Sequence, residues 1–188
     1  EYSSAASDVY KRQLFLKVKE QRFVYPHKSD VRLIAVFVLP AKQGFSRNLE
    51  ISEIIGQLWV AENSFGVPRD HANKKVTNVV MMGMGEPLLN FDAVTGAMSM
   101  MMDDKAYGLS KRKVTLSTSG LVPLIDKLSD VTDAALTISL HAPNDQLRNE
   151  LVPINKKYPI KKLLESVIRY VDKCGDSRKT TIEYILIC

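Results

Sequence analysis

The pattern of apolar and polar positions switches repeatedly, from residue 49 onward, between a repeat typical of helices and one typical of buried strands. A first helix is predicted where side chains recur on one helical face, at Ile51, Ile54, Ile55, Leu58, Trp59 and Glu62. Asn48 or Ser52 is placed to cap its start. Short strand patterns follow at 76–82, 114–117, 134–140 and 180–187.

Helical patterns separate these predicted strands, at 92–102, 121–128 and 159–175. Asp92 is the predicted cap of the first of them, and Pro159 and Gly175 bound the last. Strands joined by helical crossovers predict an α/β fold, a parallel sheet with helices outside. The pattern leaves open whether this sheet is doubly wound or is part of a (β/α) barrel.

The two ends of the chain differ from this pattern. Residues 1–13 show neither periodicity nor caps, which predicts a disordered or foreign segment. The last predicted strand is apolar, and no later segment would cover its far edge. We therefore expect a fold that is truncated at both ends.

Composition excludes several classes of protein. The 188 residues are 45% hydrophobic, which is typical of a globular domain. Two cysteines, Cys174 and Cys188, are too few for a disulfide framework or a four-ligand zinc site, so a reducing cytoplasm is expected. No run approaches the roughly 18 apolar residues that cross a bilayer, and no secretory signal is visible, so no membrane partner is expected. The net charge of +5 suits either a polyanionic partner or a solvated surface.

Ligands of parallel α/β folds collect at the carboxyl ends of strands, and polar residues follow three of the predicted strands. The first such segment is Met82-Gly83-Met84-Gly85-Glu86-Pro87, in which glycine permits close backbone approach and Glu86 offers a carboxylate to an ammonium group. The alternative is a plain glycine turn with a solvated glutamate.

The second and third strand ends carry hydroxyl and imidazole groups. Ser117-Thr118-Ser119-Gly120 can bind a carboxylate or cap the next helix. In Ser139-Leu140-His141, the histidine can bond a ribose, move a proton or satisfy a core carbonyl. Because three polar ends belong to one sheet, we expect a small-molecule site along one rim.

Two basic clusters can be interpreted equally well as phosphate-binding sites and as solvated loops. They are Lys111-Arg112-Lys113 and Lys156-Lys157, with Tyr107 and Tyr158 nearby for base stacking.

Residues 41–187 closely resemble the RlmN/Cfr family of radical S-adenosylmethionine (SAM) RNA methyltransferases. The resemblance is carried by five segments: AKQGF (41–45), NVVMMGMGEP (78–87), LSTSG (116–120), SLHAPND (139–145) and VPINKKY (152–158). It implies a partial (β/α) radical-SAM barrel over residues 41–188. It also implies that Gly85 and Glu86 hold the SAM amino group, while Ser117 and Ser139-Leu140-His141 line the rest of the cofactor.

The resemblance further implies a [4Fe–4S] cluster on a CxxxCxxC loop and methylation of an adenine of 23S rRNA. The methyl group goes to C2 in RlmN-type enzymes, which also modify a tRNA, and to C8 in Cfr-type enzymes. A flavodoxin-type electron donor and a monomeric enzyme are implied as well.

The segment 14–40 departs from the family, because Val31, Ala35 and Val38 stand where three cluster cysteines are expected. Without thiolates no cluster is expected in this chain. A reading frame shifted by one base explains the difference, since Val or Ala after a codon ending in T becomes TGT or TGC. The preceding residues all have codons that can end in T, namely Asp30, Ile34 and Phe37.

We therefore expect a fragment of an adenine-C2 methyltransferase that is inactive as printed, with no catalytic residue assigned in it. Cys188 lies at the wrong place for the family's methyl-carrying cysteine, and Cys174 is expected to be an incidental thiol. Three alternatives remain: a Cfr-like C8 enzyme, a cluster-free module that binds SAM or RNA, and a non-functional product.

Overall fold

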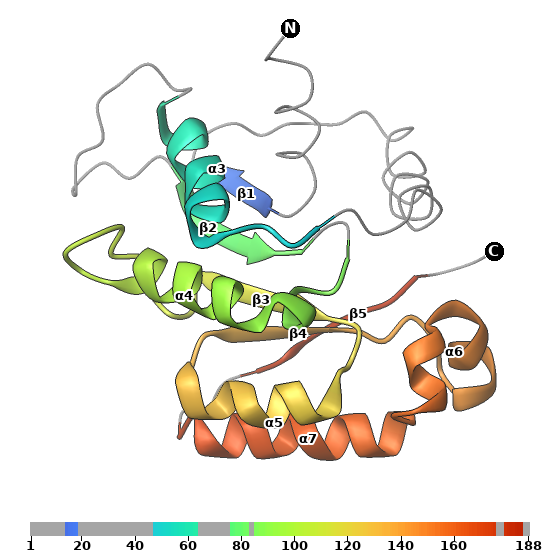
Figure 1. The fold of residues 1–188 in the computed structure, drawn as a ribbon. Helices are drawn as coiled ribbons and strands as arrows, with labels where there is room; N and C mark the ends of the chain where they lie inside the picture. Colours follow the sequence, from blue (N-terminus) through green and yellow to red (C-terminus); the bar gives the residue numbers. More distant parts are fainter. Residues whose placement is uncertain (1–13, 19–46, 64–75, 83–84, 176–178, 186–188) are drawn as a thin grey trace, which may run out of the picture.

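The computed structural model describes residues 14–18, 47–63, 76–82, 85–175 and 179–185 (Figure 1). The predictions made for residues 1–13, for the altered cluster positions 31, 35 and 38, and for Cys188 lie outside these ranges.

The centre of the fold is a five-stranded sheet in the order β1-β2-β3-β4-β5. Its strands are β1 (Leu14–Val18), β2 (Val76–Met81), β3 (Val114–Thr118), β4 (Ala135–Ser139) and β5 (Thr181–Glu183). Strands β2 to β5 are parallel, and β1 pairs antiparallel with β2, which the pattern did not predict. A doubly wound sheet reverses its strand order at a switch point, whereas these strands follow one another in sequence. The architecture is therefore a partial (β/α) barrel.

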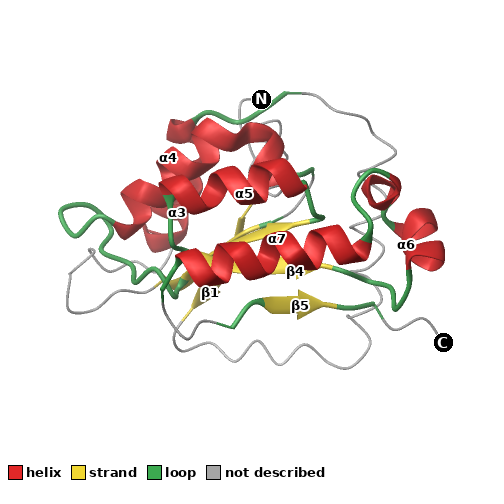
Figure 2. Ribbon diagram, turned by 90° about the horizontal axis from the view of Figure 1, so that it is seen from below, coloured by secondary structure: helices red, strands yellow, loops and turns green. Residues whose placement is uncertain are grey.

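Each parallel strand is joined to the next through helical structure, as predicted. The long helices are α3 (Ile51–Asn63), α4 (Phe91–Met102), α5 (Val122–Val131) and α7 (Ile160–Lys173). Helices α5 and α7 lie side by side against the sheet (Figures 1 and 2). Three short elements were not predicted: the 3₁₀ turn η1 (Pro87–Asn90) before α4, and helix α6 (Asp145–Leu151) and the 3₁₀ turn η2 (Pro153–Lys156) between β4 and α7.

The core lies between the sheet and the crossover helices. Its fully enclosed apolar side chains come from every long helix and from β2 to β4, and include Leu58, Val79, Met98, Leu116, Ile125, Ile138 and Leu163. Met98 and Met101 are therefore core residues, as the spacing predicted. Burial of this apolar surface is the main favourable contribution to folding.

The buried face of α3 differs from the prediction. Trp59 is 60% exposed, while Gln57, which was not predicted on this face, is buried beside Ile54 and Leu58. Glu62 is buried, in agreement with its predicted place on the face. The helix contacts its neighbours along the stripe that runs through Ile54 and Leu58, and Trp59 lies next to that stripe rather than on it.

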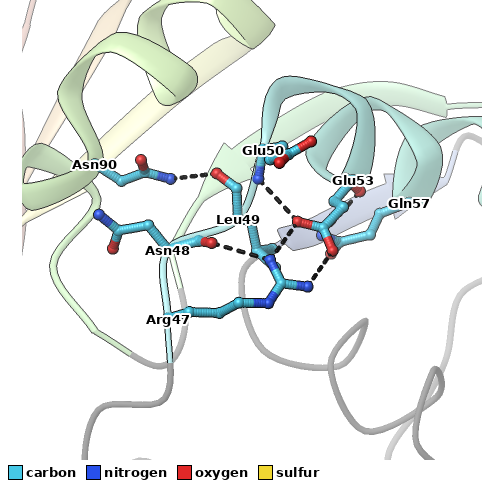
Figure 3. Close-up of polar contacts among 7 residues, drawn as sticks. All are labelled: Arg47, Asn48, Leu49, Glu50, Glu53, Gln57 and Asn90. Carbon is cyan, nitrogen blue, oxygen red and sulfur yellow. Dashed lines mark hydrogen bonds and ion pairs between the residues drawn. The ribbon is translucent and has the colours of Figure 1, made fainter.

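The start of α3 is held by Glu53 rather than by the predicted caps (Figure 3). Its Oε2 accepts the Glu50 backbone N–H at 2.9 Å, which is half of a capping box. Arg47 forms a two-pronged ion pair with the same carboxylate, in which Nη1 lies 2.7 Å from Oε2. The predicted Asp92 cap of α4 is also wrong: Asn90 is the N-cap residue, and its side chain instead donates to the Leu49 carbonyl at 2.7 Å.

Within the described ranges, no helix has the length and apolar character needed to cross a membrane.

Candidate functional site

The carboxyl ends of β2 to β5 carry a connected set of polar side chains, which we call the rim. The rim consists of Glu86, Ser117, Ser119, Ser139, His141 and Glu183. The strands are parallel and sequential, so their carboxyl ends meet at one edge of the sheet, as the sequence argument required.

Glu86 joins the end of β2 to the end of β3. Its Oε2 accepts the backbone N–H of Ser119 at 2.8 Å and the Ser119 hydroxyl at 2.6 Å. Its Oε1 accepts the Leu88 N–H at 3.1 Å, which caps η1. Glu86 is therefore a half-buried, oriented carboxylate and not a solvated side chain on a turn. Gly85 before it has φ +110°, a conformation that favours glycine, and it is exposed with open space around it.

These contacts also decide between the two interpretations of the β3 end. Ser119 binds a carboxylate, that of Glu86, and the N-cap residue of α5, Leu121, provides no side-chain cap. The Thr118 hydroxyl accepts the Gly120 N–H at 3.1 Å and so stabilises the turn out of the strand. The hydroxyls at this strand end organise the rim rather than the next helix.

A second chain of contacts runs from β3 to β5. The hydroxyls of Ser117 and Ser139 lie 3.5 Å apart, and the Ser139 hydroxyl donates to Glu183 Oε2 at 2.8 Å. Ser117 is buried, whereas Ser139 and Glu183 are half-buried. The sequence analysis missed Glu183, although it is the last residue of a parallel strand and the strand-end rule applies to it.

His141 occupies a strained position next to this chain. Its φ is +61°, in the left-handed region that side chains other than glycine rarely adopt. The backbone N–H groups of Leu140 and His141 both donate to the Glu183 carbonyl, at 3.1 and 3.2 Å. This shared acceptor fixes the path of the backbone through Leu140, itself half-buried against the core.

The imidazole of His141 has an unused hydrogen-bonding atom. Its Nδ1 is buried and has no hydrogen-bond partner in the structure. Burial lowers the pKa of His141; the Glu183 carboxylate opposes that shift and the Arg148 guanidinium adds to it. The imidazole is therefore neutral at neutral pH, and in either tautomer its Nδ1 can pair with a ligand hydroxyl, which both donates and accepts.

The rim fits a zwitterionic nucleoside such as SAM. The carboxylate of Glu86 suits an ammonium group, and the orphaned Nδ1 of His141 suits a ribose hydroxyl. A buried polar atom without a partner is rare in proteins; Gln57 Oε1 and Glu62 Oε2 of α3 are the other such side-chain atoms among the described residues.

An iron–sulfur cluster does not fit the described residues. They include no group of three His, Cys, Asp or Glu side chains placed to hold a metal ion. Their free cysteine, Cys174, lies at the carboxyl end of α7. We derive no chemical step through a cluster in this chain.

The two basic clusters lie at opposite ends of the sheet. Lys111-Arg112-Lys113 directly precedes β3, at the amino ends of the strands, and Lys111 pairs with Asp133. Lys156 and Lys157 are exposed and directly follow Asn155. The Asn155 side chain accepts a hydrogen bond from Arg148, whose guanidinium also bonds to the strand ends of the rim. Lys157 also lies 5.4 Å from the Tyr158 ring centroid. Only the second cluster neighbours the rim.

Known proteins resemble this chain both in sequence and in structure. Residues 67–188 match the radical SAM superfamily. A Dual-specificity RNA methyltransferase RlmN of Marinobacter nauticus is 60% identical over 155 residues, which are 82% of this chain and 42% of that protein. The protein of the same name from Saccharophagus degradans is 64% identical over 152 residues, or 80% and 38%. The chain thus spans about two fifths of the length of these relatives.

The structural comparison agrees with the sequence comparison. The crystal structure of a radical SAM methyltransferase from Sphaerobacter thermophilus superposes with a TM-score of 0.68 at 40% identity. The match covers 77% of this chain and 41% of that one.

Proposed function

Because this chain belongs to the radical SAM superfamily, we propose that it is the SAM-binding part of a dual-specificity RNA methyltransferase acting on adenine C2 of 23S rRNA and tRNA. The reaction class is supported by the 60–64% identity to enzymes of that name. The observation that carries the proposal is the connected rim, which joins the ends of four successive strands through Glu86, Ser139 and Glu183.

The chain's own residues divide the work of binding SAM between them. When bound, SAM supplies the methyl group. Glu86, already oriented by Ser119 and Leu88, accepts hydrogen bonds from the ammonium group. Ser117, Ser139 and neutral His141 hydrogen-bond the nucleoside, and the open space at Gly85 lets the backbone approach it. Cluster chemistry requires cysteines at positions 31, 35 and 38, which the frameshift hypothesis would restore.

The RNA partner is supported by uncompensated positive charge beside the rim. Lys156, Lys157, Lys161 and Lys162 are all exposed, and none of them belongs to an ion pair of the described residues. By contrast, Lys111, Lys127 and Lys173 each face an aspartate. We propose that the four unpaired lysines contact RNA phosphates; a cytoplasmic location follows from RNA substrates of this kind. The flavodoxin-type donor and the monomeric state stay predictions.

Saturable binding of SAM to the whole 188-residue chain tests the rim. Equilibrium dialysis should show that Glu86→Gln weakens SAM binding at least about tenfold, because a charge-assisted hydrogen bond is lost. The amide oxygen can still accept from Ser119, whereas the amide NH2 cannot accept the Leu88 N–H. Glu150→Gln, an exposed glutamate on α6, is the matched control and should leave binding unchanged. No saturable binding by the unchanged chain would contradict the proposal.

The reaction is tested on the gene. Sequencing the DNA across codons 13–42 should show cysteine codons at positions 31, 35 and 38 in the shifted frame. The enzyme expressed from that frame should yield 2-methyladenine in 23S rRNA and tRNA fragments, identified by mass spectrometry. A product methylated at C8 would place it with Cfr-type enzymes instead.

One observation favours a second candidate, a non-catalytic module that binds SAM and RNA. The rim is complete although the printed sequence has no cluster cysteines. Confirmation of the printed reading frame, together with SAM binding that depends on Glu86, would support it.

A further inference from the structure

The guanidinium of Arg148 is entirely enclosed at the base of the rim. Arg148 lies on α6 and is 0% exposed. Its Nε donates to the Leu140 carbonyl at 3.0 Å, and its Nη2 donates to the carbonyls of Ser119 and Ser139 at 2.6 and 3.2 Å. Its Nη1 donates to Asn155 Oδ1 at 2.9 Å. A full positive charge is thus held by neutral oxygens.

The position of these acceptors gives Arg148 its importance. Ser119 directly follows β3, Ser139 is the last residue of β4, and Leu140 directly follows it. One planar group therefore ties together two adjacent strand ends, each of which carries rim side chains. The fixed fork of an arginine serves several acceptors in different directions, which the single ammonium of a lysine does not reproduce. The ion pairs of the described residues do not include Arg148.

Asn155, which belongs to the segment 152–158, orients this guanidinium. Asn155 is 1% exposed, and its Nδ2 donates to Asp145 Oδ1 at 2.9 Å and to Asn149 Oδ1 at 2.8 Å. Both donors of the amide are directed to these acceptors, so its oxygen faces Arg148. Asp145 also accepts the Ile160 N–H at 2.8 Å, a bond that lowers the pKa of this carboxyl.

Resting on the SAM site proposed above, we propose that Arg148 is a positioning residue for that site. Its guanidinium sets the spacing of the β3 and β4 ends, and Asn155 holds it in place. Two consequences reach the ligand side chains. Ser119 is kept where its N–H and hydroxyl orient Glu86, and His141 is kept in its left-handed conformation next to Leu140.

The electrostatics of His141 agree with this geometry. The charged groups that act on its imidazole are Glu183 on β5 and Arg148 on α6, with opposite effects on its pKa, while burial lowers that pKa. Burial is the main cause of the lowered pKa of His141, and Arg148 adds to it.

Amide hydrogen exchange followed by NMR on the whole chain separates positioning from general stability. In Arg148→Lys, which keeps the charge and loses the fork, exchange at Ser119, Leu140 and His141 should accelerate at least about tenfold. Amides in the middle of β3 and β4, such as those of Leu116 and Leu136, should be unchanged. SAM should bind about tenfold more weakly. Arg169→Lys, at an exposed arginine on α7, should change neither quantity.

Asn155→Ala provides a second variant that keeps Arg148, and it should change the same amides by a smaller factor. Equal acceleration along both strands would mean a merely structural residue and would overturn the proposal. Unchanged rim exchange and unchanged SAM affinity in Arg148→Lys would overturn it too. If the unchanged chain binds no SAM, the proposed function fails, while the exchange measurement still decides whether Arg148 positions the strand ends.

Discussion

Arg148 on α6 and Arg169 on α7 make a similar number of hydrogen bonds in opposite surroundings. Arg148 is enclosed and donates to three backbone carbonyls and an amide oxygen. Arg169 has a 56% exposed side chain and grips the Asp126 carboxylate, with Nε and Nη2 at 3.1 and 2.9 Å from Oδ1. If charge pairing decided the contribution to stability, Arg169 would contribute more. If burial decides it, Arg148 contributes more.

The comparison shows that the worth of a contact depends on what replaces it. When an exposed ion pair is removed, water hydrates both partners again, so little is lost. When an enclosed donor is removed, its acceptors stay buried without partners, and their full desolvation cost appears. The rim should therefore be sensitive to substitution, and the polar pairs on the helix surfaces should be tolerant.

The largest effect is expected from Arg148→Met, which keeps much of the volume and removes every donor. The carbonyls of Ser119, Ser139 and Leu140 lose a buried partner. The free energy of unfolding should therefore fall by at least about 3 kcal/mol. The midpoint of urea unfolding, at unchanged slope, measures this. A variant as stable as the original chain would show that the cost of burying the charge cancels its hydrogen bonds.

Gly120→Ala should give the next largest effect on the rim side. Gly120 has φ +112°, and a Cβ there would lie 3.0 Å from both methyl carbons of Leu163. We expect a loss of about 2 kcal/mol from backbone strain and crowding.

The matched control is Gly56→Ala in α3, where a Cβ meets no atom within 4 Å. That change should stabilise the chain by about 0.5–1 kcal/mol, because alanine suits a helix interior better than glycine. Equal signs for the two alanine variants, measured by urea unfolding, would contradict the contrast between the two regions.

Local patterns in the sequence were enough to predict most of the fold. Helices α4 and α7 and strands β2 to β4 have apolar periods that depend only on their own residues, and the structure confirms them. Helix α6 was missed because the residue it buries is Arg148, so no apolar stripe marks it. Trp59 was misplaced because periodicity gives a face only to within one neighbouring position, and packing decides which edge of it is covered.

The strand-end residues of the candidate site could be predicted from the sequence, whereas the residues behind them could not. Ser117 lies at the carboxyl end of β3, and Glu86 and His141 lie shortly after β2 and β4, so the strand-end rule places all three at one edge of the sheet. Arg148 donates to backbone carbonyls on other elements, and Asn155 is its side-chain partner; no spacing rule reveals such contacts. Assignment of SAM-binding roles to Gly85, Leu140 and the other rim residues stays a prediction.

Glu53→Gln tests a partly exposed pair between the two extremes. Hydrogen bonding to Arg47, together with the Glu50 N–H, lowers the pKa of Glu53 to about 2 from an ordinary value of 4.5. A carboxyl whose pKa is lower in the folded chain adds stability above the unfolded value and loses it as the pH falls toward the folded value. The wild type should therefore exceed the variant by less than about 1 kcal/mol above pH 5, with the difference shrinking from there to pH 2.

Urea unfolding of both chains between pH 7 and pH 2.5 measures that difference. A difference that grows on acidification would have the wrong sign for a lowered pKa and would contradict the pairing of Glu53 with Arg47.

The smallest effect is expected from Arg169→Met, the same chemical change as Arg148→Met at the surface. Asp126 keeps its hydrogen bond from the Ser166 hydroxyl at 2.8 Å, and water replaces the guanidinium. The unfolding midpoint should move by little more than the error of the measurement, and 1 M NaCl should remove what remains, because salt screens exposed charges. A shift comparable to that of Arg148→Met would mean that charge pairing, not burial, sets the worth of these arginines. It would also remove the reason for treating the Arg148 network as the part of the chain that shapes the rim.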